Sequence, residues 1–258
     1  MSSETDQAES HHVSLVVPCY NEAARINAQL FRKFLAESPT ARILFVDDGS
    51  GDNTVQVLEE LCHGYGERAI VLRSIRNQGK AEAVRSGFSH ALQDSQQEIV
   101  GYWDADLATP LDSVKNFLKV FDERPGIEMI FGSRVKLLGR HVERSAARHY
   151  LGRVFATVVS VVLRLPIYDT QCGAKLFRVT PELRRVFAEP FLSKWVFDVE
   201  ILARYLKLYR NDTGHLEQII YEYPLEAWVD VAGSKVRPKD FLTALMDILR
   251  IQRRYLSN

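Results

Sequence analysis

The strongest constraint on the fold is an alternation of short apolar runs with amphipathic segments in the first half of the chain. The apolar runs predict β-strands at residues 13–17, 42–46, 69–72 and 99–103. The amphipathic segments between them predict helices at residues 22–36, 52–61 and 80–92. Strands and helices that alternate at this spacing predict a mostly parallel sheet with helices covering its faces. Ligands of such sheets bind beyond the carboxyl ends of the strands, so the residues that follow each strand are the first candidates for function.

The second half of the chain is less regular. It predicts strands at 127–131, 168–177 (a turn and a short strand) and 218–223, and helices at 144–165, 195–208 and 238–255. No composition shift marks a linker. We therefore expect one α/β domain over residues 13–258, preceded by a polar, disordered lead-in at residues 1–12.

Bulk composition excludes some classes of partner. Lys plus Arg and Asp plus Glu both number 33, so the overall charge gives no reason to expect a nucleic-acid partner. A local basic stretch at residues 134–153 is suited to binding anions. Three widely spaced cysteines form no metal or disulfide pattern, which favours a reducing, cytoplasmic compartment. No apolar run approaches the ~20 residues of a spanning helix, so we expect a chain that does not cross a membrane but can lie on one.

Acidic residues follow two of the predicted strands. Asp104-Ala105-Asp106 comes directly after the strand at 99–103, and residues i and i+2 of an extended segment share a face. Both carboxylates can therefore reach one hard cation, although a solvated turn is the alternative interpretation. Asp47 and Asp48 follow the strand at 42–46. Nicotinamide and P-loop chemistry are disfavoured, because neither a Gly-x-Gly-x-x-Gly nor a Walker motif follows the first strand.

Five short motifs resemble those of the family 2 inverting glycosyltransferases, in family order. They are Val16-Val17-Pro18-Cys19-Tyr20-Asn21-Glu22, Phe45-Val46-Asp47-Asp48-Gly49-Ser50, Asn77-Gln78-Gly79-Lys80, Asp104-Ala105-Asp106 and Gly132-Ser133-Arg134. The resemblance covers residues 13–255 and implies the GT-A fold, a Rossmann-like nucleotide-binding architecture with a mostly parallel central sheet.

Segments of the second half are similar to those of dolichyl-phosphate β-glucosyltransferases. These segments are Asp169–Phe177, Trp195–Glu200 and Gly233–Lys235, together with Leu107-Ala108-Thr109. Eukaryotic members carry an N-terminal membrane anchor that this sequence does not show. The Gln-x-x-Arg-Trp motif of processive synthases is also missing, so we expect a soluble or peripheral enzyme that adds one sugar.

The resemblance assigns the donor side of the site. It implies Mg²⁺ or Mn²⁺ bound by Asp106 and Asp104, with Asp104 on either the metal or the ribose. Asp47 and Asp48 would bind base or ribose, although a helix-capping role is open. The other donor-binding candidates are Pro18, Tyr20, Glu22, Lys80 and Lys235. Packing for Tyr20 and a plain surface position for Lys80 remain alternatives.

The acceptor side is implied to be cationic. A polyprenyl phosphate is already ionised near neutral pH, so it needs positioning by basic groups and no strong base. Its candidate ligands are Arg134, Arg144, Ser145 and Arg148. Residues 154–163 would then pack against lipid or, alternatively, form a core helix. Asp198 is the candidate general base if the acceptor is a hydroxyl; with a phosphate acceptor it would hold a sugar hydroxyl or order an arginine.

The expected reaction is transfer of one glucose from UDP-glucose to a polyprenyl (dolichyl-type) phosphate, with inversion, at the cytoplasmic face of a membrane. The product would be a β-linked polyprenyl phosphate sugar. Mannose transfer from GDP-mannose and transfer to a soluble hydroxyl acceptor are the enzymatic alternatives. A catalytically silent nucleotide-sugar-binding protein is the alternative from a different class.

Overall fold

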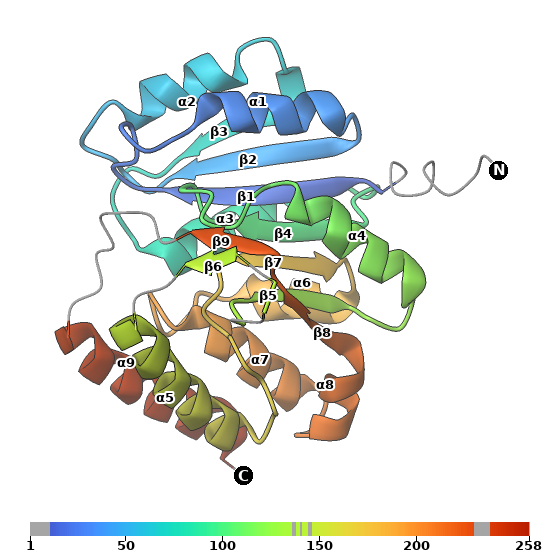
Figure 1. The fold of residues 1–258 in the computed structure, drawn as a ribbon, viewed down its shortest axis with the longest axis vertical. Coiled ribbons are helices and arrows are strands. Elements are labelled where there is room, and N and C mark those ends of the chain that lie inside the picture. Colours follow the sequence, from blue (N-terminus) through green and yellow to red (C-terminus); the bar gives the residue numbers. More distant parts are fainter. Residues whose placement is uncertain (1–10, 136–137, 140, 144–145, 230–237, 258) are drawn as a thin grey trace.

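A seven-stranded sheet forms the centre of the computed structural model, which describes residues 11–135, 138–139, 141–143, 146–229 and 238–257 (Figure 1). Its strand order is β3-β2-β1-β4-β7-β5-β8. The strands are β1 (Val13–Cys19), β2 (Ala41–Asp47), β3 (Ala69–Arg73), β4 (Ile99–Trp103), β5 (Met129–Ser133), β7 (Ala174–Arg178) and β8 (Ile220–Pro224). Only β7 runs antiparallel to its neighbours within this described sheet. The expected mostly parallel sheet is confirmed.

Helices cover both faces of the sheet through two separate apolar clusters. One face packs against α1 (Ala28–Glu37), α2 (Thr54–Cys62) and α4 (Ser113–Glu123). The other packs against α3 (Lys80–Ala91), α5 (Ala146–Leu163), α6 (Pro181–Ala188), α7 (Phe197–Leu208), α8 (Thr213–Ile219) and α9 (Pro238–Ile251). Phe88 lies at the centre of this second cluster, stacked on Phe187 with ring centroids 4.0 Å apart. Such burial of aromatic surface stabilises the helix layer.

Several short elements complete the chain. A 3₁₀ turn occupies Gly66–Arg68, and a π-helical turn, Gln252–Leu256, continues α9. A separate two-stranded ribbon pairs β6 (His141–Glu143) with β9 (Ala227–Val229) in parallel. Among the described residues, no helix combines the length and apolar character needed to cross a bilayer. His11, at the start of the described chain, contacts Glu98 at 3.0 Å and Asp122 at 2.7 Å.

The helix expected at 22–36 begins only at Ala28. The amides of Glu22 and Ala23 donate to Thr54 Oγ1, at 2.9 and 3.1 Å, which holds this stretch in a turn. Asn27 then caps the helix by accepting the amide of Leu30 at 3.2 Å. The sequence prediction also missed α4, α6 and α8. The predicted start of the first helix was therefore wrong by six residues, because a side chain from α2 takes the amides that a helix start would leave free.

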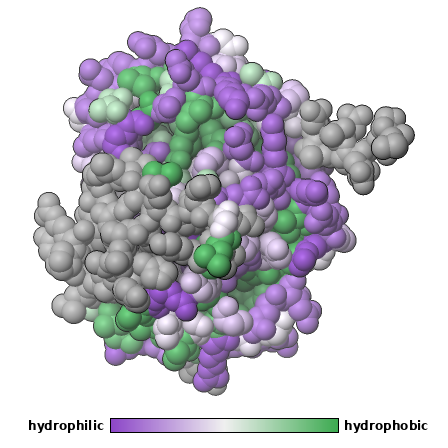
Figure 2. Space-filling view, in the orientation of Figure 1, coloured by the Kyte–Doolittle hydropathy of each residue, from purple (hydrophilic) through white to green (hydrophobic). Residues whose placement is uncertain are grey.

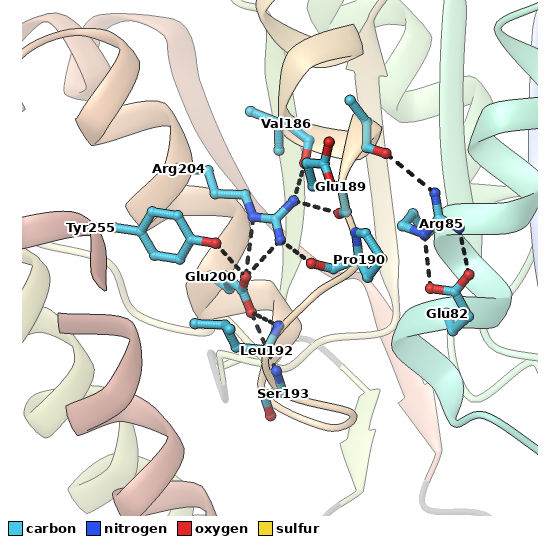
Figure 3. Close-up of polar contacts among 11 residues, drawn as sticks. Glu82, Arg85, Val186, Glu189, Pro190, Leu192, Ser193, Glu200, Arg204 and Tyr255 are labelled. Carbon is cyan, nitrogen blue, oxygen red and sulfur yellow. Dashed lines mark hydrogen bonds and ion pairs between the residues drawn. The ribbon is translucent and has the colours of Figure 1, made fainter. Parts of the chain in front are cut away.

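The C-terminal layer is joined by a buried ion pair on α7 (Figure 3). Arg204 lies 2.7 Å from Glu200, and it donates to the carbonyls of Val186, Glu189 and Pro190. Tyr255 also donates to Glu200, at 3.0 Å. This cluster fixes the connection between α6 and α7 and attaches the C-terminal turn to it.

Strand direction and register bring the functional candidates to one edge of the sheet. The last residues of β1 and β2 pair, Cys19 with Asp47, and Arg73 of β3 pairs with Asp47 on the other side. Because β7 is antiparallel, its first residue, Ala174, pairs with the last residue of β4, Trp103. The segment before Ala174 therefore meets the Asp pair that follows Trp103.

Candidate functional site

Asp48 is fixed by backbone amides at the end of β2. Its two carboxylate oxygens accept the amides of Gln78 and Gly79, at 2.8 and 2.7 Å. Gly79 has a φ of +100°, a value that favours glycine, and it is the residue directly before α3. Asp48 is buried, at 3% exposure. Its role within the described structure is to hold the Asn77-Gln78-Gly79-Lys80 loop against the end of β2.

Asp47 keeps one oxygen available. Its Oδ2 accepts the amide of Ser50 at 3.2 Å, whereas its Oδ1 is buried and has no hydrogen-bond partner among the described residues. A buried carboxylate oxygen without a donor is unfavourable unless a ligand supplies one. The imide N–H of a uracil ring or a ribose hydroxyl is a donor of the required kind.

Asp104 is paired with Lys80 and packed against a glycine. Asp104 Oδ1 lies 2.5 Å from Lys80 Nζ, and both side chains are about a third exposed. The amide of Asp104 donates to Gly173 O at 2.9 Å. A Cβ added to Gly173 would lie 1.8 Å from Asp104 Oδ2, so any larger residue here would displace that carboxylate. Burial opposes the charge of Lys80, but the nearby carboxylates of Asp104 and Asp198 raise its pKa.

Asp106 is held by a second basic side chain. Arg25 donates to Asp106 Oδ2 at 3.0 Å, and Arg25 Nε lies 3.3 Å from Glu22. Asp106 Oδ1 accepts the amide of Ala108 at 3.1 Å. Burial, followed by the negative charge of Asp104, raises the pKa of Asp106. Two carboxylates that repel one another in a partly buried place favour a shared cation.

The donor set suits a divalent hard cation. Asp104 and Asp106 supply carboxylate oxygens, the ligands that Mg²⁺ and Mn²⁺ prefer. No third carboxylate, imidazole or thiolate joins them into a cluster within the described part of the chain. The protein would therefore contribute few ligands, and phosphate oxygens and water would complete the coordination, as is usual for Mg²⁺ at phosphate sites.

Arg134 meets Asp169 at the end of β5. Its guanidinium donates from Nε and Nη2 to the two carboxylate oxygens, at 2.6 and 2.7 Å. Burial opposes the ionisation of Asp169, but Arg134 lowers its pKa to about 2. The amides of Tyr168 and Asp169 both donate to Glu222 at 2.8 Å. Burial opposes the charge of Arg134, but Asp169 raises its pKa. Arg134 directly follows β5, at the edge of the sheet where β4 ends and β7 begins.

Asp198 is buried in the first turn of α7. Its Oδ1 lies 2.7 Å from Lys175 Nζ and also accepts the Tyr102 hydroxyl. Burial and the charge of Asp198 hold the pKa of Tyr102 well above its usual value, so this hydroxyl stays protonated and donates. Lys80 Nζ lies 5.9 Å from the centre of the Tyr102 ring, so Tyr102 connects Asp198 to the pair of Lys80 and Asp104.

The remaining predicted residues fall into two groups. Pro18, Tyr20 and Glu22 follow or end β1, with Tyr20 exposed at 39%. Arg148 lies in the first turn of α5, with only its backbone described. Arg144, Ser145 and Lys235 lie outside the described residues. The structure therefore brings Asp47, Asp48, Lys80, Asp104, Asp106, Asp198 and Arg134 to one edge of the sheet.

Three residues of the site were not among the predicted candidates. Arg25 binds Asp106, Gly173 contacts Asp104, and Lys175 pairs with Asp198. Arg25 and Lys175 are single basic residues in segments with other prominent features, so no local pattern marks them. Gly173 lies within the Asp169–Phe177 segment named above. Its contact with Asp104 arises only because β7 runs antiparallel to β4.

The comparisons with known proteins agree on a family. The profile of Glycosyl transferase family 2 matches residues 14–182. The chain is 32% identical to human dolichyl-phosphate beta-glucosyltransferase over 262 residues, covering 95% of this chain and 76% of the relative. It is 30% identical to the Saccharomyces cerevisiae dolichyl-phosphate beta-glucosyltransferase, covering 98% of this chain and 78% of the relative.

Solved structures show the same fold at lower sequence identity. Glucosyl-3-phosphoglycerate synthase from Mycobacterium tuberculosis, in complex with phosphoglyceric acid, superposes with a TM-score of 0.65 at 17% identity, covering 95% of this chain and 82% of that chain. Its complex with Mn²⁺, UDP-glucose and phosphoglyceric acid gives a TM-score of 0.64 at 17% identity, covering 95% and 81%. This likeness identifies the GT-A architecture expected from the sequence. With a family match over most of its length and a carboxylate site at the strand ends, the chain belongs to glycosyl transferase family 2.

Proposed function

We propose that the protein transfers glucose from UDP-glucose to a polyprenyl phosphate of the dolichyl type, with inversion at the anomeric carbon. The observation that carries this proposal is the similarity, at about 30% identity over nearly the whole chain, to dolichyl-phosphate beta-glucosyltransferases from several organisms. The product is a β-linked polyprenyl phosphate glucose. The arrangement of charges at the sheet edge supports the same reaction.

The donor half binds the nucleotide at the ends of β1, β2 and β4. Asp47 Oδ1 accepts an N–H of the base, and Tyr20 and Pro18 form the wall beside it. Asp104 and Asp106 would hold Mg²⁺ or Mn²⁺, which as a Lewis acid would neutralise the charge of the diphosphate leaving group. Lys80 lies beside Asp104 and directs its ammonium toward the same phosphates, with Lys235 as a further donor-binding candidate.

The acceptor half supplies cationic positioning. An ionised phosphate oxygen of the lipid attacks the anomeric carbon from the face opposite the diphosphate. The bond from that carbon to the diphosphate oxygen breaks, and its electron pair leaves with UDP. No proton needs to be removed from the acceptor, so a base is not required. Arg134, which Asp169 holds at the end of β5, is one candidate ligand of the acceptor phosphate, and the others are Arg144, Ser145 and Arg148.

The state of Asp198 is consistent with a phosphate acceptor. Its Oδ1 is already engaged by Lys175 and by the Tyr102 hydroxyl. A general base needs access to the proton that it removes, whereas this side chain is 6% exposed. We therefore assign Asp198 to ordering the site, and we reserve the base role for a hydroxyl acceptor.

Contact with the cytoplasmic face of a membrane is part of the proposal. Large apolar side chains are exposed on α5 and α9, where Figure 2 shows apolar surface at the lower left. They are Val154 and Val161 on α5, and Leu245, Met246 and Leu249 on α9. Arg250, Arg253 and Arg254 follow on the same C-terminal segment and are exposed. Apolar residues flanked by arginines are suited to an anionic membrane surface. The three free cysteines suit a reducing compartment.

A radiolabel assay tests the proposal. The purified chain is incubated with dolichyl phosphate, Mg²⁺ or Mn²⁺, and one of a panel of labelled UDP- and GDP-sugars, and lipid is then extracted. We expect label from UDP-glucose in the lipid phase, lost on chelation and in Asp106→Asn. The matched control is Asp112→Asn, an exposed aspartate at the start of α4. Label from GDP-mannose alone would overturn the sugar assignment, and label that stays in the aqueous phase would overturn the lipid acceptor.

A further inference from the structure

Lys175 is a fully buried lysine that the proposed reaction does not use. It lies on β7, opposite Tyr102 of β4 and Phe131 of β5, and has 0% exposure. Its ammonium lies 5.2 Å from the Tyr102 ring and 4.9 Å from the Phe131 ring. A buried lysine is costly unless its charge is paired and its donors are satisfied.

The three N–H groups of this ammonium have three partners. They are Thr170 O at 2.9 Å, Cys172 O at 2.6 Å and Asp198 Oδ1 at 2.7 Å. An ammonium has no fourth donor, so the group is saturated. Lys175 therefore ties the loop before β7 to the first turn of α7.

That loop reaches the carboxylate of Asp104. Gly173 accepts the amide of Asp104 at 2.9 Å. A Cβ on Gly173 would overlap Asp104 Oδ2 at 1.8 Å, so the backbone of the loop is in contact with the side chain. At its other end the loop is held by Asp169, which pairs with Arg134. A shift of the loop would move Asp104 and the partner of Arg134 together.

We propose that Lys175 is a positioning residue for the donor site, acting through the loop of residues 169–173 on Asp104. It sets the direction of the Asp104 carboxylate and with it the affinity for the metal–diphosphate unit. This inference rests on the proposed function for the identity of the donor. In this inference, the role of Asp198 is to form the ion pair with Lys175.

The alternative is that Lys175 stabilises the fold without affecting the ligand. A matched control for that alternative exists on the same helix. Glu200 and Arg204 also form a buried ion pair on α7, and Arg204 also binds three backbone carbonyls (Figure 3). Its carbonyl partners belong to the last turn of α6 and the connection from α6 to α7, and not to the loop that contacts Asp104.

The test compares two charge-neutral double variants by calorimetric titration with UDP, with and without Mn²⁺, and by thermal unfolding. Replacing both members of a buried pair avoids an unpaired charge. In Lys175→Met with Asp198→Asn, we expect the Mn²⁺-dependent gain in UDP affinity to fall about tenfold or more, as for other residues that orient metal ligands. Uridine affinity stays unchanged. In Glu200→Gln with Arg204→Met, unfolding temperature falls but the Mn²⁺-dependent gain is retained.

A single variant keeps the inference falsifiable if the first double variant does not fold. Gly173→Ala leaves Lys175 intact and displaces Asp104 directly, so the gain should fall. An unchanged gain in Gly173→Ala, or an equal loss in both double variants, would overturn the inference. Wild-type protein that binds Mn²⁺ and UDP without transferring glucose would instead refute the proposed function.

Discussion

The two acidic pairs at the sheet edge look alike in sequence but are held in different ways. In the first pair, Asp48 is 3% exposed and bound by two backbone amides. In the second pair, Asp104 and Asp106 are about a third and a quarter exposed, and they are bound by the side chains of Lys80 and Arg25. In the first pair the contacts of the carboxylates are backbone amides, whereas basic side chains bind both members of the second pair, and Asp106 accepts one amide in addition.

This difference separates a structural carboxylate from a ligand-binding one. Backbone amides cannot leave without breaking a loop, so they hold both carboxylate oxygens of Asp48 in place. Lysine and arginine side chains can rotate away from a carboxylate when a divalent cation replaces them. Asp104 and Asp106 are therefore the pair suited to metal and diphosphate, and Asp48 is the residue that keeps the neighbouring loop in place.

The largest expected effect comes from Asp104→Asn. The amide keeps the shape of the side chain but removes the charge that binds the metal. We expect kcat/KM for glucose transfer to fall about 1000-fold, since metal stabilisation of a leaving group amounts to several kcal/mol. Unfolding temperature should change little, because a partly exposed ion pair contributes little to stability. Activity close to wild type would mean that the second pair does not bind the metal.

Asp48→Ala should show the opposite pattern. It removes the acceptor of the Gln78 and Gly79 amides in a buried place. Two partly buried amides left without an acceptor cost about 2 to 3 kcal/mol in the free energy of unfolding. Urea unfolding measures this loss, and Asp48→Asn serves as the milder control because one amide oxygen remains. If Asp48→Ala unfolds at the same urea concentration as the wild-type protein, the amide contacts of Asp48 do not stabilise the loop.

Asp169 is an intermediate case, bound by both an arginine and a backbone amide. Its pKa is lowered from 3.8 to about 2 in the folded protein. A lowered folded pKa gives stability that is fully present above pH 3.8 and is lost as the pH falls through about 2. The shift corresponds to about 2 kcal/mol. Urea unfolding of wild type and Arg134→Met between pH 7 and pH 2 should show a stability difference that narrows as the pH falls. A constant difference would contradict the pairing.

The fold was largely predictable because its first half repeats one pattern. Each strand from β1 to β4 is a short apolar run, and the helices between them are amphipathic. The missed helix α6 has a local signal, since Thr180 caps it and Pro181 occupies its first turn. The start of α1 had no such signal. It depends on Thr54, which is far along the chain and takes the amides of Glu22 and Ala23.

The location of the candidate residues was predictable where they directly follow a strand. Asp47, Asp104 and Asp106 were placed correctly by that rule. The partners of those residues were not predictable, because they come from distant elements. Lys175 reaches Asp198 only because β7 runs antiparallel between β4 and β5. The sequence likewise does not distinguish Asp48 from Asp104, since the amides and side chains that bind them lie elsewhere in the chain.

Asp47→Asn carries the smallest expected effect, and it separates binding of the base from binding of the diphosphate. Its Oδ1 is buried without a partner, whereas Oδ2 accepts the amide of Ser50. In the variant, the amide oxygen should keep the contact with Ser50 and turn the NH₂ group toward the ligand. A donor would then face the N–H of the base, so calorimetry should show about tenfold weaker binding, a loss of about 1.4 kcal/mol. The affinities for uridine and UDP should fall equally, in contrast to Asp104→Asn, where only UDP affinity falls. If Asp47→Asn binds uridine and UDP as tightly as the wild-type protein does, Asp47 is not part of the base-binding site.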